Sequence, residues 1–177
     1  MKEILLDRQS IYNGKIVSLF KDTVECSNGV KSSREVVDHK PAVVVIPIHQ
    51  DGSITLIKQY RHAVNRVLIE CPAGCVDKGE DMLQAAQREL AEECGLKAIN
   101  WQLVHTGFPT PGFCNEIYYL YVAKNLSNFK LPQDKDEVIQ TLTLSFSEFE
   151  NLVFTEKISD IKTLLAYYIL KAREDLF

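Results

Sequence analysis

The stretch from Gly74 to Leu96 constrains this chain more than any other part of its sequence. It begins as a glycine-containing loop and continues as a helix-forming segment of roughly three to four turns. Gly79 and Glu80 are expected to open the helix, with negative charge near the positive end of its dipole. Gly95 is expected to end it in a left-handed conformation. An apolar stripe at helical spacing predicts the buried face, formed by Leu83, Ala86, Leu90 and Cys94.

Another face of this helix carries three glutamates, Glu89, Glu92 and Glu93. Their spacing brings the carboxylates within reach of one another. Like charges at this spacing destabilise an isolated helix by roughly a few tenths of a kcal/mol each, and carboxylates near a helix C-terminus also oppose the dipole. A divalent cation would compensate, because Mg²⁺ and Mn²⁺ prefer hard oxygen ligands. The alternative interpretation is a solvated acidic face.

The wider spacing favours the metal site. Gly74 is followed by five residues and Glu80, then by seven residues and the run Arg-Glu-Leu-Ala-Glu-Glu-Cys-Gly-Leu at positions 88–96. This pattern resembles the Nudix box, the signature of the Nudix hydrolase superfamily, at each of its fixed positions. The resemblance implies an α/β (α+β) fold, the Nudix fold, in which a mixed β-sheet is sandwiched between helices.

Stretches outside the box are similar to the ADP-ribose pyrophosphatase branch of this superfamily. They are Lys58-Gln59-Tyr60-Arg61, Leu68 to Gly74, Thr110 to Glu116 and Asp136 to Ile139. The resemblance implies Mg²⁺-dependent hydrolysis of the diphosphate of ADP-ribose to AMP and ribose 5-phosphate, with two or three ions per site and Mn²⁺ able to substitute. It also implies a homodimer whose N-terminal sheets exchange between subunits.

The same resemblance assigns the metal and catalytic groups. The backbone of Ala73, Glu89 and Glu93 look like metal ligands, and Glu92 looks like a ligand of a further ion or a partner to water. The break after the preceding strand should expose the Ala73 carbonyl, which is a hard-oxygen donor. The catalytic candidates are Glu92, Glu93 and Glu137. Glu137 best matches the general base, and the alternative is a solvated charge in an acidic loop.

Five further residues are candidates for binding the substrate. Arg61 looks like a diphosphate or ribose contact, and Gly112 and Glu116 look like members of the ribose-side pocket. Arg34 stands where the branch often has a substrate arginine, the alternative being a surface arginine. Glu70 either lines the same cleft or faces solvent at a strand end. Position 115 is Asn where the branch commonly has Asp, so the identity of the sugar is less constrained than cleavage of a diphosphate.

The chain is expected to divide into a small N-terminal antiparallel sheet, residues 1–38, and a Nudix hydrolase domain, residues 39–177. Asn13-Gly14 and Asn28-Gly29 predict two hairpins within residues 10–37. The apolar run from Ala42 to Ile48 predicts a central strand buried on both faces. The segment from Val67 to Cys71 predicts a strand that Pro72 ends before the box helix.

Two helices are expected after residue 145. Ser147 and Glu150 predict a capping box for a short helix, and Ser159 is expected to cap the terminal helix. The terminal helix is predicted to bury one apolar face, formed by Ile161, Leu164, Leu165, Tyr168, Ile169 and Ala172.

Net charge and cysteine content limit which binding partners and which cellular compartment are expected. The net charge of −4 over 177 residues, without a run of Lys or Arg, argues against nucleic acid and anionic membranes as partners. Five cysteines without a Cys-x-x-Cys pair predict reduced thiols and a cytoplasmic protein. Cys71 and Cys75 are interpreted as packing residues in preference to a zinc site. The first eight residues contain no long apolar stretch, so no signal peptide is expected.

Two other functions fit the same residues. One is a Nudix pyrophosphatase acting on another nucleotide sugar or on a dinucleotide. The other is a noncatalytic domain that binds ADP-ribose as a sensor, a class that usually loses the box glutamates. In each case the expected partner is a small-molecule nucleoside diphosphate derivative.

Overall fold

The computed structural model describes residues 1–133 and 137–177, which form two compact units. The first unit contains Met1–Pro41 together with Phe108–Ile117. The second contains Ala42–Gly107 and Tyr118–Phe177. The loop at residues 108–117 therefore folds with the N-terminal segment, which the predicted division at residue 38 did not include. Asp136, part of one stretch used for the family resemblance, lies outside the described residues.

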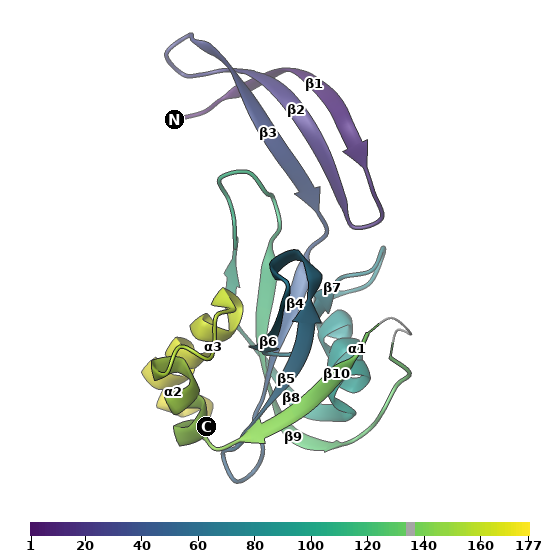
Figure 1. The fold of residues 1–177 in the computed structure, drawn as a ribbon, viewed down its shortest axis with the longest axis vertical. Helices are drawn as coiled ribbons and strands as arrows, with labels where there is room; N and C mark the ends of the chain where they lie inside the picture. The colour runs from purple at the N-terminus through teal and green to yellow at the C-terminus, as the bar shows by residue number, and fades with distance from the viewer. Residues whose placement is uncertain (134–136) are drawn as a thin grey trace. The chain divides into compact units, whose positions relative to one another are not determined.

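The first unit is a three-stranded antiparallel sheet in the order β1-β2-β3 (Figure 1). Its strands are β1 (Ile4–Asn13), β2 (Val17–Glu25) and β3 (Lys31–His39). Turns at Asn13-Gly14 and Asn28-Gly29 join them, so both predicted hairpins are confirmed. The first strand begins at Ile4, earlier than the predicted extended region.

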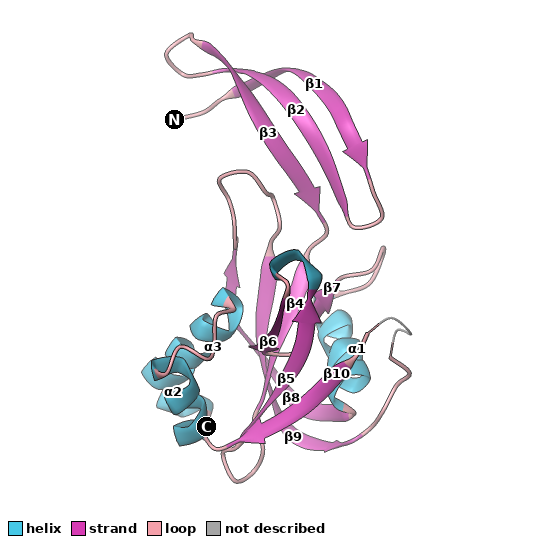
Figure 2. Ribbon diagram, viewed as in Figure 1, coloured by secondary structure: helices cyan, strands magenta, loops and turns pink. Residues whose placement is uncertain are grey.

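The second unit contains two sheets (Figure 2). One is antiparallel in the order β10-β5-β6, and the other has the order β7-β4-β9-β8. The second sheet is mixed, because β4 and β9 run parallel while the other pairs are antiparallel. The strands are β4 (Ala42–Pro47), β5 (Ile54–Arg61), β6 (Arg66–Glu70), β7 (Ala73–Cys75), β8 (Leu96–Gly107), β9 (Tyr118–Asn128) and β10 (Ile139–Leu144).

Three α-helices belong to the second unit, and none of the helices in the described residues is long and apolar enough to cross a membrane. Two short 3₁₀ segments follow β5 and α3. The helical elements are η1 (His62–Val64), α1 (Met82–Cys94), α2 (Phe146–Phe154), α3 (Ile161–Ala172) and η2 (Glu174–Leu176).

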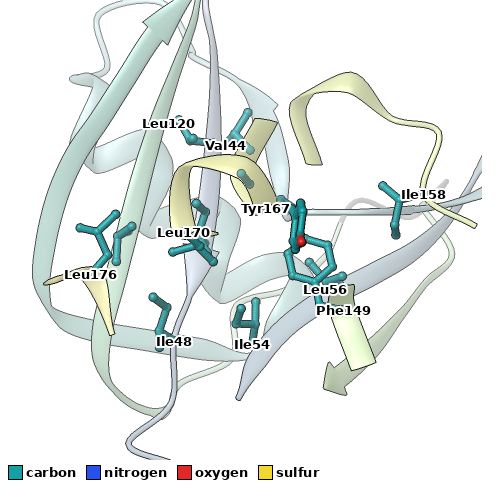
Figure 3. Close-up of a cluster of buried hydrophobic side chains, with 14 of the residues drawn as sticks. Val44, Ile48, Ile54, Leu56, Leu120, Phe149, Ile158, Tyr167, Leu170 and Leu176 are labelled. Atoms are coloured by element: carbon teal, nitrogen blue, oxygen red, sulfur yellow. The ribbon is translucent and has the colours of Figure 1, made fainter. Parts of the chain in front are cut away.

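Strand β4 is buried along its whole length, as its apolar run predicted, and its two faces serve two cores. Val44 and Ile46 belong to the core that α2 and α3 complete. Figure 3 shows Val44 in this core with Tyr167 and Leu170 of α3. Val43 and Val45 belong to the other core, which α1 completes. The mixed sheet thus lies between α1 and the pair α2 and α3, and the predicted fold class is confirmed.

The start of α1 differs from the prediction. Asp81 is the N-cap: its carboxylate accepts the backbone N–H of Leu83 at 2.9 Å, and Gln84 closes a capping box. A short polar side chain that can accept this hydrogen bond ends the loop here, two residues after Gly79. Gly95 does end the helix in the left-handed region, with φ of 66°, as predicted.

The caps of α2 and α3 were each predicted at the wrong residue. Ser145 caps α2 with Glu148, because the same Ser-x-x-Glu pattern occurs directly after β10 ends. Asp160 caps α3, its carboxylate accepting the backbone N–H of Thr163 at 2.9 Å. The buried face of α3 is also rotated from the predicted one: Ile161 and Tyr168 are exposed, and the buried residues are Thr163, Ala166, Tyr167 and Leu170.

The turn from β6 to α1 contains a strand that the sequence pattern did not reveal. Residues Ala73–Cys75 form β7, which pairs antiparallel with β4. Pro72 ends β6 as expected, but its carbonyl accepts the backbone N–H of Val45 at 2.9 Å and keeps the chain on the sheet. This pairing fixes the backbone that leads into the box helix.

Candidate active site

The first glycine of the 74–96 stretch makes room for a glutamate of α1. A Cβ atom at Gly74 would lie 2.1 Å from Glu89 Oε1, far inside van der Waals contact. Any larger residue at position 74 must therefore displace the Glu89 carboxylate. Because β7 pairs this backbone with β4, the Glu89 carboxylate of the helix occupies the space that a side chain at position 74 would fill.

Two of the three helix glutamates are buried. Glu89 is 8% exposed and Glu93 is 4% exposed, whereas Glu92 is half-buried. Burial raises the pKa of Glu89 to about 7 and that of Glu93 to about 9. The negative charge of Glu137 adds to both shifts, so Glu137 lies within electrostatic reach of the two buried carboxylates. These four acidic residues, all predicted to be functional, come together in the second unit.

Arg88 is the cation at the centre of this acidic group. Its guanidinium donates two hydrogen bonds of 2.9 Å to Glu80, one of 2.7 Å to Glu89 and one of 3.0 Å to Glu92. A further hydrogen bond of 3.0 Å reaches the carbonyl oxygen of Cys75. The ion pair with Glu80 lowers the pKa of the Glu80 carboxyl. Arg88 ties the loop, β7 and α1 together.

Glu93 contacts the backbone of the predicted ligand Ala73, whose N–H donates to Glu93 Oε2 at 2.8 Å. Within the described residues no three acidic, thiol or imidazole side chains already converge as a metal cage, and Arg88 holds Glu89 and Glu92. The donors still fit a hard divalent cation, since two buried carboxylates that repel one another lie beside the half-buried backbone of Ala73. The arrangement can hold a cation and, with it, an anionic phosphate group.

Arg61 is the last residue of β5 and Glu70 is the last residue of β6, and their side chains form a two-point ion pair. The Arg61 guanidinium donates to both oxygens of Glu70, at 2.8 and 2.9 Å. Glu70 is 1% exposed, so the alternative of a solvent-facing carboxylate is wrong. The Glu70 carboxylate raises the pKa of Arg61, and the charge of Glu93 contributes as well. Arg61 therefore lies in the field of the acidic group, held in orientation by Glu70.

The first unit brings together two other predicted substrate residues. Arg34 and Gly112 line a hollow of about 320 Å³ that also includes the exposed rings of Phe108 and Phe113. Arg34 donates a hydrogen bond of 3.1 Å to Glu3 and is half-buried, so its role as a substrate arginine stays a prediction. Glu116 is half-buried in the same unit.

Asn115 explains why the loop at residues 108–117 belongs to the first unit. Its side-chain oxygen accepts the backbone N–H of His39 at 2.8 Å, and its amide nitrogen donates to Asp38. An aspartate at this position could accept the first hydrogen bond but would repel the second partner. Asn115 stands where the family pattern has Asp, and in this chain its amide group suits the neighbouring carboxylate of Asp38.

Sequence reasoning missed a buried polar link between α3 and the box. The Thr163 hydroxyl donates to Asp160 at 2.7 Å and accepts the backbone N–H of Cys71 at 2.8 Å. Thr163 is fully buried, and Lys162 binds Asp160 at 2.6 Å. A serine or aspartate before an apolar run suggests a cap, but nothing in the sequence indicates that α3 reaches residue 71.

Comparison with known proteins decides the family. A family model described as the NUDIX domain matches residues 38–166. The chain belongs to the Nudix family. The segment from Gly74 to Leu96 is its Nudix box, and the chain is a Nudix hydrolase by family. Nudix ADP-ribose pyrophosphatases generally depend on a divalent metal.

Several relatives align over most of this Nudix chain. It is 33% identical to the ADP-ribose pyrophosphatase of Bacillus subtilis (strain 168), over 99% of this chain and 96% of that protein. It is 36% identical to the methanol dehydrogenase activator of Bacillus methanolicus, again over 99% and 96%. A crystal structure of an ADP compounds hydrolase superposes with a TM-score of 0.88, covering 99% of this chain and 95% of that one. At 21% sequence identity, that likeness shows the fold alone.

Proposed function

We propose that this Nudix hydrolase cleaves the diphosphate of ADP-ribose, giving AMP and ribose 5-phosphate. The observation that carries the proposal is the pair of buried box glutamates in a chain aligned along 99% of its length with a protein named ADP-ribose pyrophosphatase. A relative of the same name in Mycobacterium tuberculosis is 36% identical over 75% of this chain and 64% of its own length. The substrate is then a small nucleoside diphosphate sugar.

Glu89, Glu93 and the backbone of Ala73 would hold Mg²⁺, with Glu92 serving a further ion, for two or three ions in total and with Mn²⁺ able to substitute. Bound divalent cations neutralise the diphosphate and lower the pKa of water. Glu89 and Glu93 suit this role because their charges are buried beside one another. Gly74 suits it too, since its lack of a side chain leaves the Glu89 carboxylate in place.

The remaining steps belong to the protein's own side chains. Glu137, in electrostatic reach of Glu89 and Glu93, takes a proton from the water that attacks phosphorus. The oxygen of that water forms the new bond to one phosphorus, the bond from that phosphorus to the bridging oxygen breaks, and the bridging oxygen leaves with the other phosphate group. Arg61 contacts the diphosphate through Nη1, because Glu70 engages Nε and Nη2. Glu70 acts by orienting that guanidinium.

Arg34, Gly112 and Glu116 are proposed as further substrate contacts, with Arg34 and Gly112 already sharing one hollow.

We also propose a homodimer, supported by the side chains of β1. This strand is exposed along its whole length and carries apolar residues on an antiparallel edge, namely Ile4, Leu5, Leu6, Ile11 and Tyr12. We also propose a cytosolic location, supported by the five cysteines, which form no disulfide among the described residues.

The test is a substrate panel in Mg²⁺, in which release of the nucleoside monophosphate is measured for ADP-ribose, GDP-mannose and a dinucleotide. ADP-ribose should give the highest kcat/KM. Glu93→Gln should abolish turnover while preserving the fold, since a glutamine oxygen can still accept the Ala73 N–H. Preferential cleavage of another diphosphate would replace the substrate, and tight ADP-ribose binding without hydrolysis would favour the sensor. Near-normal activity of Glu93→Gln would refute the ligand assignment.

A second candidate function comes from the Bacillus methanolicus relative. Its name is that of an activator of a dehydrogenase, and its identity of 36% over 99% of this chain is slightly above that of the Bacillus subtilis relative. An activator should raise the rate of a methanol dehydrogenase when the two proteins are mixed. Equal activation by the wild type and by Glu93→Gln would separate such a role from hydrolysis.

A further inference from the structure

Gln59, on β5, is a buried polar residue whose side chain is not satisfied. The residue is 8% exposed, and its Oε1 atom has no hydrogen-bond partner among the described residues. A buried acceptor without a donor costs free energy, so protein interiors rarely keep one without a use.

Strand pairing places Gln59 on the face of the sheet that meets the box helix. Gln59 is directly opposite Ile139 on β10, and its neighbour on the same face, Ile57, is opposite Thr141. Ile139 and Thr141 line a polar hollow of about 180 Å³ together with Glu92 and Glu93 of α1. Directly opposed residues of an antiparallel pair share a face. The Gln59 side chain therefore projects to the side of the sheet that carries the acidic group.

The second strand neighbour of β5 gives the same placement. Ile57 is opposite Glu70 on β6, so Gln59 shares its face with Glu70 and with Arg61, two residues further along. Residues of the opposite face, such as Leu56, belong to the core with α2 and α3. Gln59 thus stands among residues that the proposed function uses, whereas its amide takes part in none of their hydrogen bonds.

We propose that Gln59 Oε1 accepts a hydrogen bond from an O–H group that arrives with the ligand. The donor is a water in the hydration shell of the divalent cation or a hydroxyl group of the substrate sugar. Carboxylates of the acidic group are acceptors and cannot satisfy this oxygen. The inference rests on the proposed function, and it adds Gln59 to the residues that contact the ligand.

The experiment compares Gln59→Leu with Gln140→Leu. Leucine has a similar volume and no polar atom, and Gln140 is an exposed glutamine on β10, on the opposite face of the same sheet. In the metal-free protein, Gln59→Leu should leave Tm unchanged or raise it, because it removes an unsatisfied buried acceptor. A lower Tm than that of Gln140→Leu would mean that the amide has a partner within the protein, and would overturn the proposal.

Binding is then measured by calorimetry, first with Mn²⁺ alone and then with Mn²⁺ and a methylene-bridged ADP-ribose analogue. A loss of Mn²⁺ affinity of about tenfold or more in Gln59→Leu, but not in Gln140→Leu, supports the proposal and assigns the donor to the cation's water. A similar loss for the analogue alone supports it and assigns the donor to the sugar.

Unchanged affinities for both ligands overturn the proposal while leaving the proposed function in place. A wild-type protein that binds neither Mn²⁺ nor the analogue overturns the proposed function, and this inference with it. The two failures are therefore distinguishable in one set of titrations.

Discussion

Replacing Gly74 with alanine should remove most of the turnover and leave the fold nearly intact. The new Cβ would lie 2.1 Å from Glu89 Oε1 and 2.5 Å from Oε2, whereas ordinary van der Waals contact begins at 3.4 Å. The carboxylate must move by about 1 Å or more, and a misplacement of that size lowers rates by about 10²-fold. Stability should fall by only about 1–2 kcal/mol, because the displaced atoms end a flexible side chain.

The assay pairs steady-state hydrolysis of ADP-ribose with urea unfolding, and Gly52→Ala is the control. Gly52 has φ of 81°, and no atom lies within 4 Å of the position that a Cβ would take, so alanine there strains the backbone of a turn and touches nothing. Gly52→Ala should lose about 1 kcal/mol of stability and keep its activity. Wild-type turnover in Gly74→Ala, or a loss of activity explained by unfolding alone, would refute the reasoning.

Two further predictions concern the supports of the site. Arg88→Lys should lower the free energy of unfolding by about 1–3 kcal/mol and reduce turnover, because an ammonium group cannot keep the two-point bond to Glu80; an unchanged Tm would contradict this. Asp160→Ala should lower it by about 1–2 kcal/mol at neutral pH, whereas Ser159→Ala should be neutral. Burial raises the pKa of Asp160, but Lys162 and the hydrogen bonds of the cap outweigh it and hold the pKa below its usual value. The stability from Asp160 is thus present above about pH 4 and lost as the pH falls further, so urea unfolding should show the difference between Asp160→Ala and wild type shrinking there; a constant difference would count against it.

Much of the fold follows from local patterns. The Nudix box helix, both N-terminal hairpins and the buried strand at Ala42 were predictable, because each depends on residues within a few positions of one another. Helix starts were less predictable, since Ser145 and Ser147 offer the same cap two residues apart. The face of α3 was misjudged because Thr163, a polar residue, is buried with its hydroxyl satisfied by Asp160 and Cys71.

The site was predictable in its residue types and less so in its contacts. The acidic group lies on one helix, so spacing alone brought Glu89 and Glu93 together. The partners of Arg61 and Asn115 depend on chain segments far away, such as the 76 residues that separate Asn115 from His39. Burial of Glu70 depends on how the rest of the chain packs around β6, which the residues near position 70 do not determine. The unsatisfied oxygen of Gln59 is visible only when the surrounding donors are placed.

Calorimetric titration of the metal-free protein with Mg²⁺ and Mn²⁺ tests the central claim most directly, namely that Glu89 and Glu93 are held together by divalent cations. Wild type should bind the cations, and the double substitution Glu89→Gln and Glu93→Gln should bind at least about tenfold more weakly while unfolding at a similar temperature. No uptake by wild type, with or without nucleotide, or equal uptake by the substituted protein, would contradict the account.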